Sequence, residues 1–301
     1  MRNLQPASVG VVIPSYNSAD FLEETVTSVL AQSVPVSQIV VIDDASPDDD
    51  SFAIAQRLAA SHPHIISIRQ ENAGAAAARN AGFSLLDTEF VIFLDADDRL
   101  APDAVAHHLE AFAARPDAVM VLGSKNIIDA AGRLLSEPRD PVEVVDREKL
   151  ALRVTPGPSQ CMYRSDVFER AGRLDPSLRP GDEIDLNLRL ERMGEIYSHA
   201  KLAMDYREHP GQGTRRRVSN ARAHLAALEK NLGPGAPEPD PALWRLARRY
   251  WLSRYGRAQF RAAVGQVRRG NLSDAVAPAR LWLDAVPAWL HDGLFGKPQI
   301  P

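Results

Sequence analysis

The 301-residue chain has 45% hydrophobic and 25% charged side chains, which is ordinary for a globular protein and enough for a core of roughly 200 to 250 residues with an appendage. Its 18 glycines and 22 prolines are close to average usage and exclude collagen-like and wholly disordered chains. The single cysteine, Cys161, cannot form an internal disulfide, which fits a reducing compartment and excludes a zinc site built from cysteines. We therefore expect a folded protein in the cytoplasm.

The distribution of charge along the chain limits its partners. Residues 1–214 hold 20 Lys and Arg against 33 Asp and Glu, whereas residues 215–301 hold 15 against 6. An acidic body argues against wrapping nucleic acid, and a basic tail favours an anionic partner or a cover for the acidic body. The N-terminal sequence does not have the pattern of a signal peptide, and no run approaches the roughly 18 consecutive apolar residues that span a bilayer.

Short β-branched runs alternate with helical stretches in the first part of the chain, the pattern of parallel strands joined by crossover helices. This predicts an α/β fold with a mostly parallel sheet flanked by helices, in which ligands collect beyond the carboxyl ends of the strands. Asp20 is the expected N-cap of the first helix, because Glu23 stands three residues later as in a capping box. The predicted strands are 9–13, 39–42, 65–68, 90–94 and 119–122, and the predicted helices are 21–31, 50–60, 75–86 and 103–114.

The pattern is less regular after residue 122, where turns rich in glycine and proline predict an acceptor-side region at 123–214. A helix over 182–193 is expected within it. The stretch 233–241 is the clearest linker, and beyond it 242–290 predicts two or three helices rich in Arg, Trp and Ala. We therefore divide the chain into a body at 1–214, whose first half is 1–122, and a basic helical extension at 215–301.

Asp95-Ala-Asp97 at a strand end is the most informative short feature. Two carboxylates two residues apart can reach one hard divalent cation and a ribose hydroxyl together, and such a cation keeps open positions for diphosphate oxygens. The alternative is an ordinary turn, because Asp-rich turns are common.

Four motifs appear in one order over the first 100 residues, and three of them follow predicted strands. They are Ile13-Pro-Ser-Tyr-Asn17, Val41-Ile-Asp-Asp44, Glu71-Asn-Ala-Gly74 running into Arg79, and Phe93-Leu-Asp-Ala-Asp97-Asp98. Together they resemble the family 2 inverting glycosyltransferases of the GT-A fold, a nucleotide-binding Rossmann-like fold. The likeness extends to about residue 214 through 181–189 and 206–209.

The resemblance implies which residues bind the donor, which would be a UDP- or dTDP-sugar. Pro14 and Tyr16 match positions that line the base, where an aromatic face can stack. Asp44 matches the carboxylate that accepts a hydrogen bond from the base, and Arg79 matches a position near the phosphates. The resemblance also places Asn17, Gly74, Asp95 and Ala96 beside the nucleotide-sugar.

The same resemblance implies a manganese or magnesium site. Asp97 matches the principal metal ligand, Asp95 matches its partner on ribose or metal, and His209 matches a histidine near the diphosphate. The site residues also have structural alternatives when taken singly. Pro14 and Asn17 could be ordinary loop residues, Tyr16 a core residue, Asp43 and Asp44 an Asx-turn, and Arg79 the partner of a surface acid.

The catalytic base is where the sequence departs from the family pattern. Inverting transfer is a single displacement, so one carboxylate must take the proton of the acceptor hydroxyl. The family usually supplies it from Glu-Asp at a helix start, but here the order is Asp182-Glu183. We predict Glu183 as the base and Asp182 as the reserve; in the alternative, Asp182 caps the helix and Glu183 complements its dipole.

These features predict a metal-dependent, inverting, non-processive glycosyltransferase that acts on a sugar or glycoconjugate acceptor in polysaccharide or glycoconjugate biosynthesis. The family's processive synthases carry a Gln-x-x-Arg-Trp motif, which this sequence does not contain. Two alternatives stay open: a sugar nucleotidyltransferase and a catalytically silent nucleotide-sugar-binding module. For 242–290 the expectation is packing on the body, or contact with a membrane surface or a protein.

Overall fold

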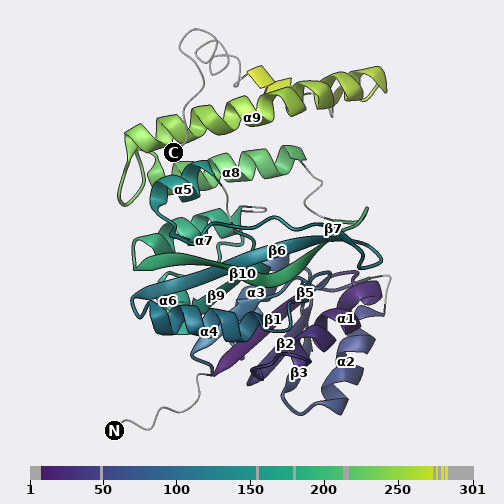
Figure 1. Cartoon of the computed structure of the whole chain (residues 1–301). Helices are drawn as coiled ribbons and strands as arrows, with labels where there is room; N and C mark the ends of the chain where they lie inside the picture. The colour runs from purple at the N-terminus through teal and green to yellow at the C-terminus, as the bar shows by residue number, and fades with distance from the viewer. Residues whose placement is uncertain are drawn as a thin grey trace. The chain divides into compact units, whose positions relative to one another are not determined.

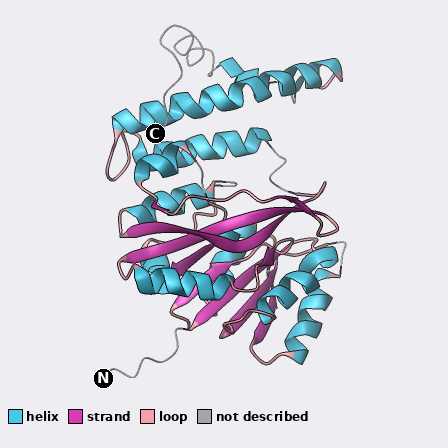
Figure 2. Cartoon of the chain, viewed as in Figure 1, coloured by secondary structure: helices cyan, strands magenta, loops and turns pink. Residues whose placement is uncertain are grey.

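The structure is a computed structural model that describes residues 8–47, 50–153, 156–178, 181–212 and 217–273, together with residues 276, 279, 280, 282 and 283. Helices and strands alternate along its first part, as the hydrophobic pattern predicts (Figures 1 and 2). The strands are β1 (Val9–Ser15), β2 (Gln38–Asp43), β3 (Ile65–Arg69), β4 (Phe90–Phe93), β5 (Arg99–Leu100), β6 (Ala118–Asp129), β7 (Leu134–Ser136), β8 (Glu143–Val144), β9 (Cys161–Arg164) and β10 (Glu195–Glu208). The helices are α1 (Ala19–Leu30), α2 (Ser51–Ser61), α3 (Ala75–Phe83), α4 (Ala104–Ala114), α5 (Arg147–Leu152), α6 (Ser165–Arg170), α7 (Asp182–Glu191), α8 (Arg217–Leu232) and α9 (Pro241–Arg268).

The strands form one sheet in the order β3-β2-β1-β4-β9-β6-β10-β5, with β7 beside β6 and β8 beside β10. β1 pairs in parallel with β2 and β4, β2 with β3, and β6 with β10. β9 runs antiparallel to both β4 and β6, so those two strands point the same way. The mostly parallel α/β sheet predicted from the sequence is therefore confirmed.

Alternation along the strands divides the core between the two faces of the sheet. The odd-numbered residues of β1, such as Val11 and Ile13, belong to a buried cluster with side chains of α1, α2 and α4. Even-numbered β2 residues, Val40 and Ile42, pack with Ala78 of α3 on the other face. α3 approaches the sheet closely at Gly82, where an added Cβ would lie 2.4 Å from a methyl group of Val12.

The chain divides into two compact units, which we describe separately. Unit 1 comprises residues 1–146, 156–176 and 189–211, and unit 2 comprises 147–155, 177–188 and 212–301. The whole sheet lies in unit 1. Unit 2 contains α5, α8, α9 and the first part of α7. Two short segments of the predicted body, 147–155 and 177–188, therefore cluster with the C-terminal part.

Several boundaries differ from the sequence-based expectation. The first helix begins at Ala19 with Ser18 as its N-cap, so Asp20 lies inside the first turn and is not the cap. The predicted linker 233–241 is a short connection from α8 to α9, whose first residue, Pro241, follows the N-cap Asp240; the Asp240 carboxylate accepts the N–H of Leu243 at 3.0 Å.

The basic extension is predicted as two or three helices over 242–290. One helix, α9, fills 241–268, and the described residues between 272 and 283 are also helical. Much of the remainder lies outside the described residues. Among the helices of the described residues, none combines the length and the apolarity needed to cross a bilayer.

Candidate functional site

Parallel strands bring the polar motifs to one edge of the sheet in unit 1. β1, β2, β4 and β10 all run in the same direction, so their carboxyl ends lie at the same edge. The Pro14–Asn17 segment, the Asp43–Ser46 segment, the Asp95–Asp98 turn and His209 lie at the ends of these strands. The sequence motifs therefore meet because of the topology.

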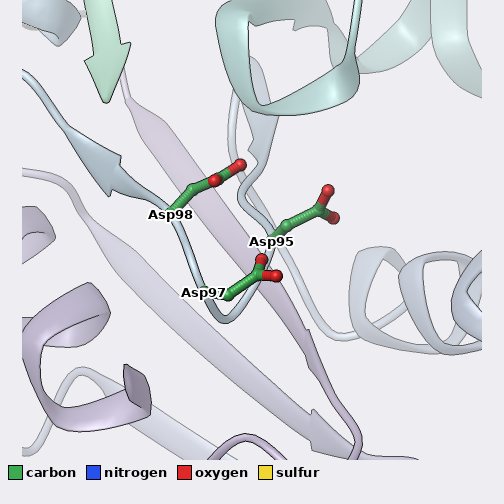
Figure 3. A group of neighbouring side chains, drawn as sticks. All are labelled: Asp95, Asp97 and Asp98. Atoms are coloured by element: carbon green, nitrogen blue, oxygen red, sulfur yellow. The ribbon is translucent and has the colours of Figure 1, made fainter. Parts of the chain in front are cut away.

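The turn after β4 gathers three carboxylates, those of Asp95, Asp97 and Asp98 (Figure 3). One potential ligand oxygen from each lies within 4.8 Å of the others. The Asp98 N–H donates to the Asp95 carbonyl at 3.1 Å, which closes the turn. In Figure 3 all three side chains project to the same side of this turn.

Side chains from other elements hold this turn in place. The Thr25 hydroxyl, on α1, lies 2.9 Å from the Ala96 carbonyl and 2.8 Å from the Asp98 carbonyl. Ser159 Oγ accepts the N–H of Asp95 at 3.0 Å. Ala96 is buried, so its place in the motif is that of a small residue in a packed turn.

Arg207, near the end of β10, is almost fully buried beside the turn, with 1% of its side chain exposed. Its Nε donates to the Asp97 carbonyl at 2.8 Å and its Nη1 to the Ala130 carbonyl at 3.1 Å. Its Nη2 pairs with a Glu24 carboxylate oxygen at 2.6 Å. The backbone N–H of Arg207 donates to Asp98 Oδ1 at 3.0 Å, so Arg207 restrains both the carbonyl of Asp97 and the carboxylate of Asp98.

His209 lies two residues further along the chain and contacts the turn directly. Its Nε2 is 2.9 Å from Asp97 Oδ2, and because a carboxylate only accepts, Nε2 carries the proton. The imidazole packs against Phe21 with ring centroids 4.9 Å apart, and the Arg207 guanidinium lies 4.9 Å from the same ring. Phe21 thus fixes both residues from α1.

The three carboxylates crowd negative charge into a partly buried place. Burial raises the pKa of the Asp97 carboxyl and the charge of Asp95 raises it further, while the hydrogen bond from His209 acts in the opposite direction. Burial, followed by the charges of Asp95 and Asp97, raises the pKa of Asp98 well above its ordinary value. A cation at this turn would offset the unfavourable crowding.

These residues fit a hard divalent cation. Carboxylate oxygens are the ligands that Mg²⁺ and Mn²⁺ prefer, and three converge here with their ligand atoms close together. Within the described residues, the converging group contains Asp98, which the sequence reasoning did not include among the ligands, and it does not contain His209.

Asp44 organises the loop that leads into α3. Its Oδ1 accepts the side-chain amide of Gln70 at 2.8 Å and the N–H of Ala73 at 2.7 Å, and its Oδ2 accepts the N–H of Gly74 at 2.7 Å. Gly74 is the N-cap of α3 and has φ of 86°, a left-handed value that favours glycine. The Asn72 side chain donates to the Asp44 carbonyl at 2.9 Å, so this loop is tied at several points to the residue that follows β2.

Strained backbone marks the ends of β1 and β2. Asn17 and Ala45 have φ of 50° and 59°, values that cost a residue with a Cβ some free energy and that cluster at functional sites. The two segments are joined, because the Asn17 N–H donates to Ser46 Oγ at 2.9 Å. Tyr16 beside them has 51% of its surface exposed, and Pro14 is half-buried and paired in register with Ile42.

Arg79 reaches the acidic turn from α3. Its Nη2 lies 2.5 Å from Asp95 Oδ1, with 5% of the Arg79 side chain and 35% of the Asp95 side chain exposed. A buried guanidinium therefore pairs with one of the three carboxylates of the turn.

The predicted catalytic pair opens α7 in unit 2. Asp182 is buried and Glu183 is partly exposed at the first turn. Asp185, one turn on, is fully buried and accepts from Lys230 Nζ at 3.0 Å and Asn231 Nδ2 at 2.8 Å on α8. Asp185 is therefore used in packing, and the candidates for the base stay Glu183 and Asp182.

The sequence analysis missed the residues that support the site. Thr25, Ser159, Arg207 and Glu24 act through contacts between positions far apart in the chain, for which a single sequence has no signal. Asp98 had one signal, because it directly follows Asp97 in the acidic run.

The geometry defines an α/β protein with an acidic turn and other polar side chains at one edge of its sheet, and comparisons with known proteins identify its class. Staphylococcus aureus TarS in complex with UDP-GlcNAc matches with a TM-score of 0.61 over 90% of each chain at 14% identity, which supports the GT-A fold. The model of the family "Glycosyl transferase family 2" matches residues 10–172, so the chain belongs to the family 2 glycosyltransferases.

Two curated relatives extend the comparison. An uncharacterized glycosyltransferase of Nostoc is 31% identical over 175 residues, covering 56% of this chain and 54% of the relative. A Bacillus subtilis glycosyltransferase named for teichuronic acid biosynthesis is 37% identical over 110 residues, covering 36% of this chain and 43% of the relative. The chain thus spans about half, or less, of the length of these relatives.

Proposed function

We propose that this chain transfers a sugar from a nucleoside diphosphate sugar to an acceptor hydroxyl, with inversion at the anomeric carbon, in the biosynthesis of a polysaccharide or glycoconjugate. The observation that carries the proposal is the acidic turn, where Asp95, Asp97 and Asp98 converge at the same edge of the sheet as the loop that Asp44 organises. TarS, which shares the fold, was solved with UDP-GlcNAc, and this supports a UDP- or dTDP-sugar as the donor.

The nucleotide binds at the ends of β1 and β2. Tyr16 is exposed enough to stack its ring on a pyrimidine, beside Pro14 and the restrained Asn17 backbone. A carboxylate offers about four acceptor sites. Asp44 makes the three hydrogen bonds described above, so about one site is left for a base N–H.

The diphosphate lies at the acidic turn. Asp97 and Asp95 hold the cation, with Asp98 as a third carboxylate, and His209 orients Asp97 through the bond to its Oδ2. When bound, Mn²⁺ or Mg²⁺ supplies the positive charge that neutralises a departing nucleoside diphosphate. Arg79 keeps Asp95 in place and adds a fixed positive charge nearby.

Glu183 takes the proton from the acceptor hydroxyl as that oxygen attacks the anomeric carbon, and Asp182 is the alternative base. Glutamate is one methylene longer than the aspartate usual at this position, so its carboxylate reaches an acceptor that sits slightly farther out. The transfer is non-processive, with one sugar added at each encounter.

A thermal-shift screen of nucleoside diphosphates with and without Mn²⁺ tests the proposal, because a ligand that binds the native state raises its melting temperature. UDP or dTDP should give the largest increase, and Mn²⁺ should enlarge it. Asp97→Asn should lose the Mn²⁺-dependent part, whereas Asp166→Asn, at a carboxylate with 70% side-chain exposure in the same unit, should keep it. Absence of stabilisation by any nucleoside diphosphate would contradict the proposal.

Product analysis separates the proposal from its two rivals. Release of a nucleoside diphosphate from the donor supports sugar transfer. Release of pyrophosphate would identify a sugar nucleotidyltransferase, and tight donor binding without turnover would identify a silent binding module.

A further inference from the structure

Helix α9 carries charge of only one sign. Its 28 residues, Pro241–Arg268, include seven arginines and no aspartate, glutamate or lysine. A solvated surface helix ordinarily mixes both signs, whereas a run of one sign attracts a partner of the opposite charge. The proposed sugar transfer uses none of these arginines.

One side of α9 is occupied within unit 2. Trp251 and Leu252 are buried, and Trp251 Nε1 donates to the Ala151 carbonyl of α5 at 2.7 Å. The Trp251 ring lies 4.1 Å from the His224 ring of α8 and stacks on Tyr255 at 5.4 Å. These contacts anchor the helix, so a further partner must use its remaining surface.

The second half of α9 presents two exposed rows side by side. Arg254, Arg261 and Arg268 are all exposed and stand seven residues apart, a spacing that returns to nearly the same side of a helix and spans about 21 Å. Phe260 and Val267, at 46% and 52% exposure, are also seven apart and form the adjacent apolar row. Arginines beside exposed apolar side chains bring together the two kinds of group that contact a membrane interface.

Further exposed hydrophobic side chains follow α9 in the chain. Leu272, Val276 and Leu283 are 66%, 64% and 58% exposed, although each is a large hydrophobic residue. The Trp282 ring contacts Phe260 with centroids 5.0 Å apart, which adds an aromatic pair next to Arg261. Tryptophan and phenylalanine favour the boundary between headgroups and acyl chains, and arginine favours anionic headgroups.

We propose that the outward basic and apolar rows of α9, with the exposed side chains that follow them, dock this chain on a membrane surface rich in anionic phospholipid. The arginines contact headgroup phosphates, and Phe260 and Val267 enter the upper acyl region. A soluble polyanion would use the arginines but gain nothing from the apolar row, and this difference decides for a lipid surface over nucleic acid.

Sedimentation of the full chain with vesicles tests the docking surface. Binding is expected to vesicles of equal parts phosphatidylcholine and phosphatidylglycerol, but not to phosphatidylcholine alone, and it should weaken as salt is added. The triple variant R254Q/R261Q/R268Q should lower the partition coefficient by on the order of 100-fold, since each basic residue near such a surface contributes about fivefold. The double variant F260S/V267S should lower it by about tenfold or more.

Matched controls separate the rows from net charge and from folding. The variant R57Q/R133Q/R170Q removes the same charge from side chains of unit 1 that are 60%, 80% and 62% exposed, and it should bind as the parent does. The variant R254K/R261K/R268K keeps the charge and should retain binding even if the glutamine variant melts early.

Three outcomes would overturn the proposal. The first is equal loss of binding in the unit 1 control, which would make the effect one of bulk charge. The second is unchanged binding in F260S/V267S together with full competition by a soluble polyanion. The third is a parent chain that is dimeric in solution and becomes monomeric in the glutamine variant, which would assign the surface to a second copy. None of these readouts depends on sugar transfer.

Discussion

Replacement of the buried Arg207 tests how the acidic turn is held. Arg207→Leu removes the donors to the carbonyls of Asp97 and Ala130 and the ion pair with Glu24, while it keeps the backbone N–H that donates to Asp98. Breaking a buried ion pair by removing one partner costs about 3–5 kcal/mol. The Glu24 side chain is 43% exposed and keeps its ion pair with Arg99, so we expect the free energy of unfolding to fall by the lower part of that range, about 3 kcal/mol.

Urea denaturation measures this loss, and a neighbouring arginine provides the control. Arg99 also pairs with Glu24 and with Asp205, but its side chain is 27% exposed. Arg99→Gln should therefore cost about 1 kcal/mol or less. Arg207→Lys keeps the charge but not the fork of donors, so it should fall between the two.

Binding of Mn²⁺, followed by titration calorimetry, distinguishes positioning of the turn from stability alone. Because Arg207 holds the Asp97 carbonyl, Arg207→Lys should weaken Mn²⁺ binding by roughly 10- to 100-fold, as loss of a supporting contact to a metal ligand generally does. A leucine variant no less stable than Arg99→Gln, or a lysine variant with parental Mn²⁺ affinity, would refute this account of Arg207.

Three further predictions concern other parts of the site and core. Glu183→Gln should lower kcat by about 100-fold or more with nearly unchanged donor affinity, and a larger loss in Asp182→Asn would transfer the role of base to Asp182. Asp44→Asn should destabilise the protein by about 1–3 kcal/mol, because an amide cannot accept at both positions that hold the loop to Gly74; an unchanged urea midpoint would contradict this. Burial lowers the pKa of His199 from 6.5 to about 4, so the unfolded state binds the proton first as the pH drops. The free energy of unfolding should therefore fall by about 3 kcal/mol between pH 6.5 and pH 4. A pH dependence of stability that His199→Phe leaves unchanged would contradict this.

The sheet, and the edge at which the polar motifs meet, could be predicted from the sequence. They depend on the local hydrophobic pattern and on the parallel direction of the strands. Alternation in runs such as Val9–Ile13 specifies buried strands, and parallel pairing then places Asp44 and Asp97 at one edge. The fine contacts were not accessible. Ser18 replaces Asp20 as the first cap, and Asp185 proves to be used by Lys230 and Asn231, since such choices depend on neighbours distant in the chain.

The support of the acidic turn was also beyond the sequence. Glu24 and Arg207 are separated by 183 positions and meet only after the sheet has formed. A buried arginine in a strand has no periodic signal that separates it from a surface arginine. The Asp182-Glu183 order shows a further limit, because a motif fixes which residues are candidates and leaves their chemistry to experiment.

One consequence follows from the 14-residue length of β10 and its irregular pairing with β6. Arg207 and His209 both follow the register shifts near Leu202, so their placement depends on the number of residues between those shifts and the strand end. A single inserted residue there would move both side chains to the other face of the sheet, and both would lose their contacts with Asp97. The number of residues within this strand is therefore constrained by the contacts that Arg207 and His209 make at its end.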